Sequence, residues 1–140
     1  MERYKFLEHM ADAKFQAYGR SLEEAFSNAA LAVAGLMWDW QNVERKLEHP
    51  VEVRGNDLEQ LLVNFLEEII FLLETKMFLL SSVEKLMIEK EKKGFRLKAL
   101  FKGDRYSEKY KIFGDVKAIT YNEMEIETGN RFMVQVVVDM

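Results

Sequence analysis

The most constraining stretch of this sequence is a capped helix that follows two short strand-like segments. Ser21 and Glu24 form the S-x-x-E pattern of a capping box, which predicts a helix that begins just after Ser21. Alternation predicts strands at residues 4–8 and 14–18, and the loop between them carries His9 and Asp12. The helix is predicted to run from about residue 22 to Asp39. Along it and just beyond it, apolar side chains recur at three or four residues, as on one face of an amphipathic helix: Leu22, Phe26, Ala29, Val33, Leu36, Met37 and Trp40.

A second amphipathic helix and a series of strands complete the pattern. A second capping box, Asn56 with Glu59 or Asp57 with Gln60, precedes an apolar stripe from Leu58 to Leu73. Further strands are predicted at residues 51–54, 83–90, 95–102, 116–127 and 132–138, with Pro50 just before the first of them. This order predicts an α+β fold in one domain, residues 1–140, with two amphipathic helices packed on a largely antiparallel sheet.

Composition excludes several classes of function. The net charge of −4 argues against broad nucleic-acid binding, and the lack of cysteine excludes disulfides, zinc-thiolate sites and a cysteine nucleophile. With two histidines and only isolated glycines, neither a nucleophilic triad nor a phosphate-binding loop is visible, so we do not expect an enzyme. No apolar run reaches the roughly 20 residues that span a bilayer, and no signal peptide is visible, so we expect a cytoplasmic protein without membrane contact.

Three carboxylates at the two ends of the chain are candidate metal ligands. Asp12 lies in the first loop, Asp139 ends a valine-rich strand, and the α-carboxylate of Met140 follows it. If they converge, they repel one another unless a cation is bound, and an all-oxygen site favours calcium, magnesium or manganese. The alternative is that Asp12 caps its loop and Asp139 is solvated, and spacing alone favours this alternative.

Three other polar residues are candidates for a supporting role. His9 precedes Asp12 by three residues and can ligate a metal, carry a proton or make a structural hydrogen bond, of which the last is favoured. Lys117 and Tyr121 lie on or near the penultimate strand, where a cross-strand pair is the simplest interpretation. Trp38 is expected to be half-exposed at the end of the first helix, Trp40 to lie in the core and His49 to lie on the surface.

Several of these segments, taken together, resemble the archease family. The resemblance rests on His9–Asp12, on Tyr18-Gly19-x-Ser21 with Leu22–Phe26, on Lys117–Tyr121 and on the end of the chain, Val136–Met140. These segments follow one another in the family's order over nearly the whole chain. Each is short, and it is their combination that is specific.

The resemblance implies a function that the residues alone do not give. Archeases assist the RtcB-type, GTP-dependent tRNA ligase in tRNA splicing by promoting its guanylylation and repeated turnover. The family's metal site implies that Asp12, Asp139 and the Met140 carboxylate bind a divalent ion, calcium foremost, which the protein delivers or positions near the ligase's nucleotide pocket. A chaperone-like role toward a tRNA methyltransferase and a small metal-dependent hydrolase are the alternatives. Asn122 stands where the family usually has histidine, which leaves the role of that position open.

Overall fold

The computed structural model describes residues 1–9 and 12–140, so Met10 and Ala11 of the His9–Asp12 motif lie outside the described residues. Within these ranges the chain forms two α-helices, a short 3-10 helix and seven strands. In chain order they are β1 (Tyr4–Leu7), β2 (Ala13–Gly19), α1 (Leu22–Gly35), η1 (Trp40–Asn42), β3 (Leu47–Gly55), α2 (Leu58–Lys76), β4 (Phe78–Glu91), β5 (Gly94–Arg105), β6 (Ala118–Glu127) and β7 (Phe132–Asp139). The predicted α+β fold is confirmed.

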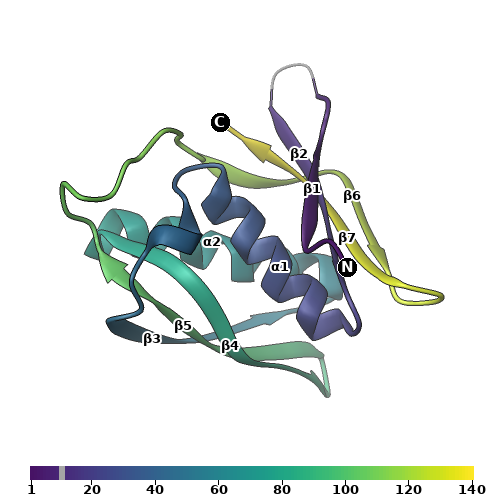
Figure 1. Cartoon of the computed structure of the whole chain (residues 1–140). Coiled ribbons are helices and arrows are strands. Elements are labelled where there is room, and N and C mark those ends of the chain that lie inside the picture. The colour runs from purple at the N-terminus through teal and green to yellow at the C-terminus, as the bar shows by residue number, and fades with distance from the viewer. Residues whose placement is uncertain (10–11) are drawn as a thin grey trace.

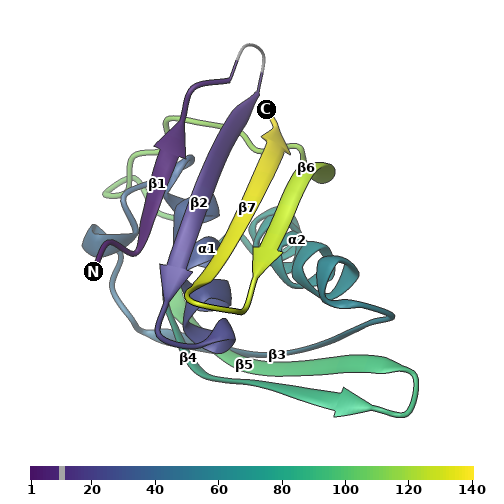
Figure 2. The ribbon, with the colours of Figure 1, turned by 90° about the vertical axis from the view of Figure 1, so that its right-hand side faces the viewer.

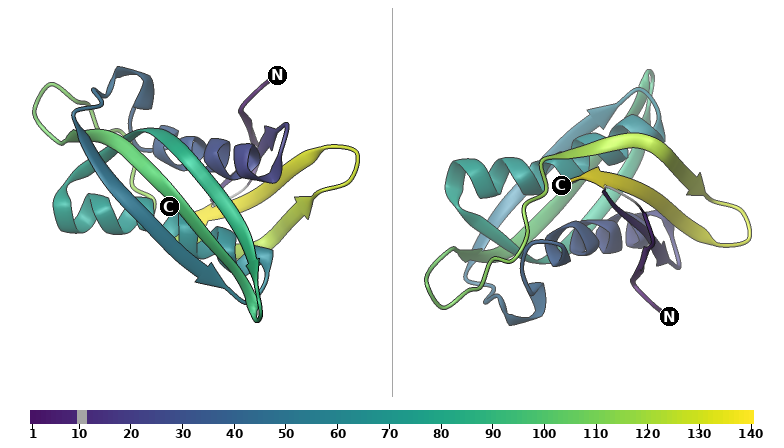
Figure 3. Two further views of the ribbon diagram at one scale, coloured as in Figure 1. Left: turned by 90° about the horizontal axis from the view of Figure 1, so that it is seen from below. Right: turned by 90° about the horizontal axis from the view of Figure 1, so that it is seen from above.

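The strands form two antiparallel sheets with the helices between them (Figure 1). One sheet has four strands in the order β1-β2-β7-β6, and the other has three in the order β3-β5-β4. Figure 2 shows the four-stranded sheet in front of both helices. The left panel of Figure 3, seen from below, shows the three-stranded sheet crossing both helices. Each helix contacts strands of both sheets, which buries α1 on more than one face. Small side chains permit this close approach, since Ala25, Ala29, Ala30, Ala32 and Ala34 are all fully buried.

Both helices begin where the capping boxes predict. Ser21 Oγ accepts a hydrogen bond from the Glu24 N–H (3.1 Å), and Glu24 Oε1 accepts one from the N–H of Arg20 (3.1 Å). For α2, the Asp57 alternative is the correct one, because Asp57 Oδ1 accepts from the Gln60 N–H at 2.8 Å. Polar side chains thus satisfy N–H groups that the first turn leaves free. Within residues 1–9 and 12–140, no helix has both the length and the apolar character needed to cross a membrane.

The first helix ends earlier than predicted. It stops at Gly35 rather than near Asp39, and the N–H groups of Met37 and Trp38 both donate to the carbonyl oxygen of Ala34 (2.9 Å each). Trp38, expected to be half-exposed, is 1% exposed, and its Nε1 donates to the carbonyl oxygen of Leu80 in β4 (2.9 Å). The apolar residues after the helix continue its pattern because they fill the core, not because they are helical.

The strand around Pro50 is also longer than predicted. Pro50 lies inside β3. Among the described residues β5 is the only strand that pairs with β3, so β3 forms an edge of its sheet. An edge strand tolerates proline because one row of its N–H groups has no partner strand. His49, expected on the surface, is half-buried, with its ring centroid 4.6 Å from that of Phe78 in an edge-to-face arrangement.

Candidate functional site

The two candidate aspartates lie at the same end of the four-stranded sheet. Antiparallel pairing of β2 with β7 places Ala13 opposite Val138. Asp12 and Asp139 are the next residues outward along the two strands, and directly opposed residues have Cα atoms about 4.5–5.5 Å apart. Figure 2 shows the C-terminus beside the start of β2. The sheet thus brings Asp12 close to Asp139, although the two come from opposite ends of the sequence.

The end of β7 is held by backbone hydrogen bonding. The carbonyl oxygen of Asp139 accepts a hydrogen bond from the N–H of Lys117 at 2.8 Å. Asp139 itself is exposed and Asp12 is half-buried. The side chain of Asp139 therefore remains accessible on a backbone that the neighbouring segment fixes.

Met140 lies against the segment before β6. A Cβ atom added at Gly114 would lie 2.1 Å from the carbonyl oxygen of Leu36 and 3.5 Å from Met140 Cε. Only glycine therefore fits at position 114, where the chain passes close to the end of α1. Met140 is 38% exposed, so this contact covers part of its side chain.

A hollow of about 640 Å³ adjoins Asp12 and is open to solvent. Its other lining residues come from β1 and the residues that follow it, from the start of β2 and from the position just after α1: Phe6, Leu7, Glu8, His9, Ala13, Lys14 and Leu36. In the described part of the chain, no three histidine, aspartate or glutamate side chains are grouped as a metal site. The candidate set contains two such side chains, and its third carboxylate belongs to the backbone terminus. These oxygen donors suit a hard divalent cation.

His9 and Lys14 both contact Glu123, a residue that the sequence analysis did not select. His9 Nε2 donates to Glu123 Oε2 at 3.0 Å, and Lys14 Nζ donates to Glu123 Oε1 at 3.1 Å. These hydrogen bonds, with His9 first and Lys14 second, hold the pKa of the Glu123 carboxyl below its ordinary value. His9 Nδ1 is buried and has no hydrogen-bond partner among the described residues. The favoured prediction, a structural hydrogen bond for His9, agrees with this geometry.

Glu123 owes its position to an irregularity in β6. The pairing of β6 with β7 is interrupted between Thr120 and Glu125, and Glu123 has a left-handed backbone with φ of 51°. The carbonyl oxygen of Glu123 accepts a hydrogen bond from Gln135 Nε2 (2.8 Å), whose side chain is nearly buried. A polar residue inside the valine-rich strand β7 is the sequence signal that could have pointed to this contact.

Gln135 extends this contact across the outer face of the sheet. Its Oε1 accepts from Gln16 Nε2 at 2.8 Å, and Gln16 Oε1 accepts from the Tyr18 hydroxyl at 2.9 Å. The three side chains join β2 to β7 and, through the Glu123 carbonyl, to the irregular part of β6. Each of the two amides donates one hydrogen bond and accepts one, which makes the arrangement directional.

Lys117 and Tyr121 do not line the hollow beside Asp12. Tyr121 is 55% exposed within the irregular part of β6. Lys117 is exposed just before β6 and lines a hollow of about 550 Å³ over α2, together with Glu67, Glu68 and Glu74. Burial raises the pKa of Glu68. Asn122 donates its backbone N–H to Thr120 Oγ1 at 3.3 Å.

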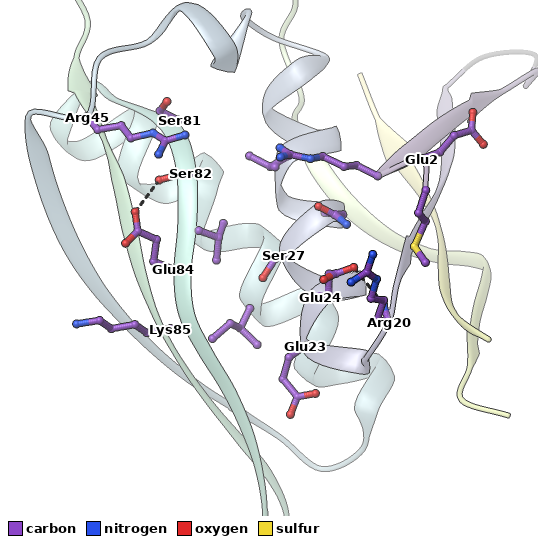
Figure 4. A pocket seen from close by; sticks show the side chains of 16 residues that line it. Glu2, Arg20, Glu23, Glu24, Ser27, Arg45, Ser81, Ser82, Glu84 and Lys85 are labelled. Atoms are coloured by element: carbon purple, nitrogen blue, oxygen red, sulfur yellow. Dashed lines mark hydrogen bonds between the residues drawn. The ribbon is translucent and has the colours of Figure 1, made fainter. Parts of the chain in front are cut away.

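Another hollow, of about 890 Å³, lies away from the aspartates, between α1 and β4 (Figure 4). Its charged side chains are mixed in sign: Arg3, Arg20, Arg45 and Lys85 with Glu2, Glu23, Glu24 and Glu84. Glu84 accepts a hydrogen bond from Ser82 Oγ at 3.3 Å. Because the charges nearly balance, this groove favours neither an anionic nor a cationic ligand.

Comparisons with known proteins give one consistent result. The model of the Archease protein family matches residues 4–140. The chain is 44% identical over 140 residues to protein archease of Pyrobaculum neutrophilum, covering 98% of this chain and 95% of that protein. It is 41% identical over 143 residues to protein archease of Pyrococcus abyssi, with 100% of both covered. The fold is similar to the solution structure of Methanobacterium thermoautotrophicum protein 1598, with a TM-score of 0.84, 31% identity and 100% coverage of both chains.

Proposed function

The chain belongs to the archease family, and from this premise we propose that it is a non-catalytic activator of an RtcB-type, GTP-dependent tRNA ligase. In this proposal it docks on the ligase with the end of the four-stranded sheet that carries Asp12 and Asp139. It promotes guanylylation of the ligase and its repeated turnover in tRNA splicing. The observation that carries the proposal is the β2–β7 register, which makes neighbours of two aspartates from opposite ends of the chain.

The donor chemistry supports a divalent cation at this end. Asp12, Asp139 and the α-carboxylate of Met140 would hold it, calcium foremost, with manganese or magnesium as the other candidates. When bound, the ion supplies a hard positive charge that offsets the repulsion among the carboxylates. The protein's part is to hold the acids at an accessible end of the four-stranded sheet. The backbone hydrogen bond between Lys117 and Asp139 supports this role.

Exposed apolar side chains near the aspartates support a docking surface. Phe6 and Leu36 line the same hollow as Asp12, and Phe6 is 46% exposed. Phe113, next to Gly114, is 56% exposed, and Met140 is 38% exposed. Apolar groups beside a charged centre are typical of a protein interface, and a solvent-open hollow of this kind favours docking over catalysis on a small substrate.

A ligase guanylylation assay tests the proposal. Asp12→Ala should abolish stimulation of the ligase while leaving the fold intact, because Asp12 contributes no apolar burial to the core. Glu108→Gln, which removes an exposed acid from the turn between β5 and β6, is the charge-matched control and should stimulate like the parent.

Thermal unfolding of each variant separates loss of function from loss of fold. A folded Asp12→Ala protein that still stimulates the ligase would contradict the proposed role of the site. If the parent protein fails to stimulate the ligase at all, the activator function itself is wrong. Release of product from a small substrate by the protein alone would favour the hydrolase instead.

A further inference from the structure

We infer that Glu123 is a positioning residue for the Asp12 site, an inference that rests on the proposed function. Its carboxylate contacts His9, which precedes Asp12 in the sequence, and Lys14, which follows it. His9 Nε2 lies 3.0 Å from one carboxylate oxygen, and Lys14 Nζ lies 3.1 Å from the other. We call Glu123, His9 and Lys14 the clamp.

The clamp joins parts of the chain that are distant in sequence. Glu123 is separated from His9 by 114 positions and from Lys14 by 109. Glu123 thereby ties β6 to both flanks of Asp12, while β7, which carries Asp139, lies between β6 and β2. One carboxylate therefore holds Asp12 in a fixed relation to the strand that bears the second proposed ligand.

The backbone around Glu123 indicates that its position is specified rather than incidental. A left-handed conformation at a residue other than glycine is unfavourable, and it persists only where the surroundings require it. Here the nearly buried amide of Gln135 donates to the Glu123 carbonyl oxygen, and Gln16 and Tyr18 fix that amide in turn. The irregular turn of β6 thus points the Glu123 carboxylate at the flanks of Asp12.

The clamp also controls charge around Asp12. The Lys14 ammonium and the His9 ring line the same hollow as Asp12. Without Glu123, the ammonium would be free to pair with Asp12 and to compete with a cation there. With Glu123 in place, His9 Nε2 and Lys14 Nζ are both hydrogen-bonded to its carboxylate, which leaves the Asp12 oxygens available.

Three variants test this in the full chain. Glu123→Asp keeps the charge but shortens the side chain, so it cannot reach both partners, and Glu123→Gln keeps the length but loses the charge. Glu125→Gln removes another exposed acid from the same strand and is the matched control. By calorimetric titration with calcium and with manganese, Glu123→Asp and Glu123→Gln should each weaken binding about threefold or more, on the scale of exposed ion pairs, and Glu125→Gln should bind like the parent.

A rescue variant separates positioning from a general loss of structure. Adding Lys14→Arg to Glu123→Asp lengthens the cation where the acid was shortened, so part of the lost affinity should return. If Glu123→Asp bound the metal ions as tightly as the parent, the inference would be overturned, because a negative charge on a shorter side chain would then be sufficient. Equal weakening in Glu125→Gln would overturn it too, because any acid of β6 would then serve.

Backbone amide exchange in the metal-free protein distinguishes this inference from the proposed function. The amides of His9 and Asp12 should exchange about threefold faster in Glu123→Asp than in the parent, and unchanged rates would overturn the clamp. If the parent binds neither ion, the metal part of the proposed function is wrong and the positioning of a metal ligand falls with it, while the exchange rates still decide whether the clamp exists. If Asp12→Ala loses binding and Glu123→Asp does not, only the inference about Glu123 is wrong.

Discussion

Single residues at the end of β7 decide whether the proposed site has two acidic ligands or three. Asp139 is exposed, and its backbone is tied to Lys117, whereas Met140 rests its side chain near Gly114 and Leu36. The side chain of Met140 therefore has a packing role, and its α-carboxylate is the group that we propose as a ligand. The two roles can be separated by mutation.

Residues added after Met140 should weaken metal binding without abolishing it. The extension turns the α-carboxylate into an amide carbonyl, which can still ligate a hard cation but carries no negative charge. Met140→Leu should be nearly silent, because it keeps the terminal charge and a similar volume. Calorimetric titration with calcium and manganese compares both with the parent, and equal affinity of the extended protein would leave Asp12 and Asp139 as the whole site.

At the scale of secondary-structure elements, α1 depends on a local signal at its start and on tertiary contacts at its end. Ser21 closes the first turn through one hydrogen bond to the Glu24 N–H. The helix ends at Gly35, and the Trp38 side chain then donates a hydrogen bond to the carbonyl oxygen of Leu80 in β4.

Ser21→Ala should lower the free energy of unfolding by about 1 kcal/mol, because the Glu24 N–H loses its acceptor at the helix start. The midpoint of thermal unfolding should fall by about 2–5 °C for a domain of this size. Ser27→Ala is the matched control inside the same helix, where alanine has the better propensity and no cap is lost. A similar loss in both variants would show that the cap contributes nothing specific.

These contrasts explain what the sequence could predict. Helix starts were predictable because a capping box is a contact between residues three apart, and most strands followed from alternation. The end of α1 was not predictable, because Met37 and Trp38 are apolar in order to pack in the core rather than to continue the helix. Glu123 was missed for the same kind of reason: its partners lie more than 100 positions away. Asp12 and Asp139 were found through the family resemblance, because spacing alone favoured two unrelated acids.

At the scale of the whole molecule, two sheets enclose a layer of helices. His49 belongs to β3, and its partner Phe78 is the first residue of β4, on the other side of β5. Its ring packs edge-to-face on Phe78. Burial, and next the charge of Lys76, lower the pKa of His49. The folded protein thus binds a proton at His49 less readily than the unfolded chain, in which the pKa of histidine is about 6.5.

The free energy of unfolding should therefore fall as the pH drops below about 6.5, because the unfolded chain then takes up a proton that the folded protein resists. The contribution is fully present above that pH and is lost as the pH falls toward the lower, folded pKa. His49→Gln should remove this part of the pH dependence. Urea unfolding at pH 7.5 and pH 5.5 measures the difference between parent and variant, and an identical change in both would rule out His49 as the cause.

The central place of β7 in its sheet has a consequence for how the protein is made. β2 pairs on one side with β1, its neighbour in sequence, but on the other side with β7, whose Gln135 is 119 positions from its partner Gln16. On the ribosome, β1, β2 and α1 therefore emerge with one strand edge open, and that edge stays open until β7 leaves the exit tunnel. Closure of this sheet should be a late step in folding, because the pairing spans most of the chain. Nascent chains stalled at residue 131 should be cut by added protease within β2, whereas released full-length chains should resist it.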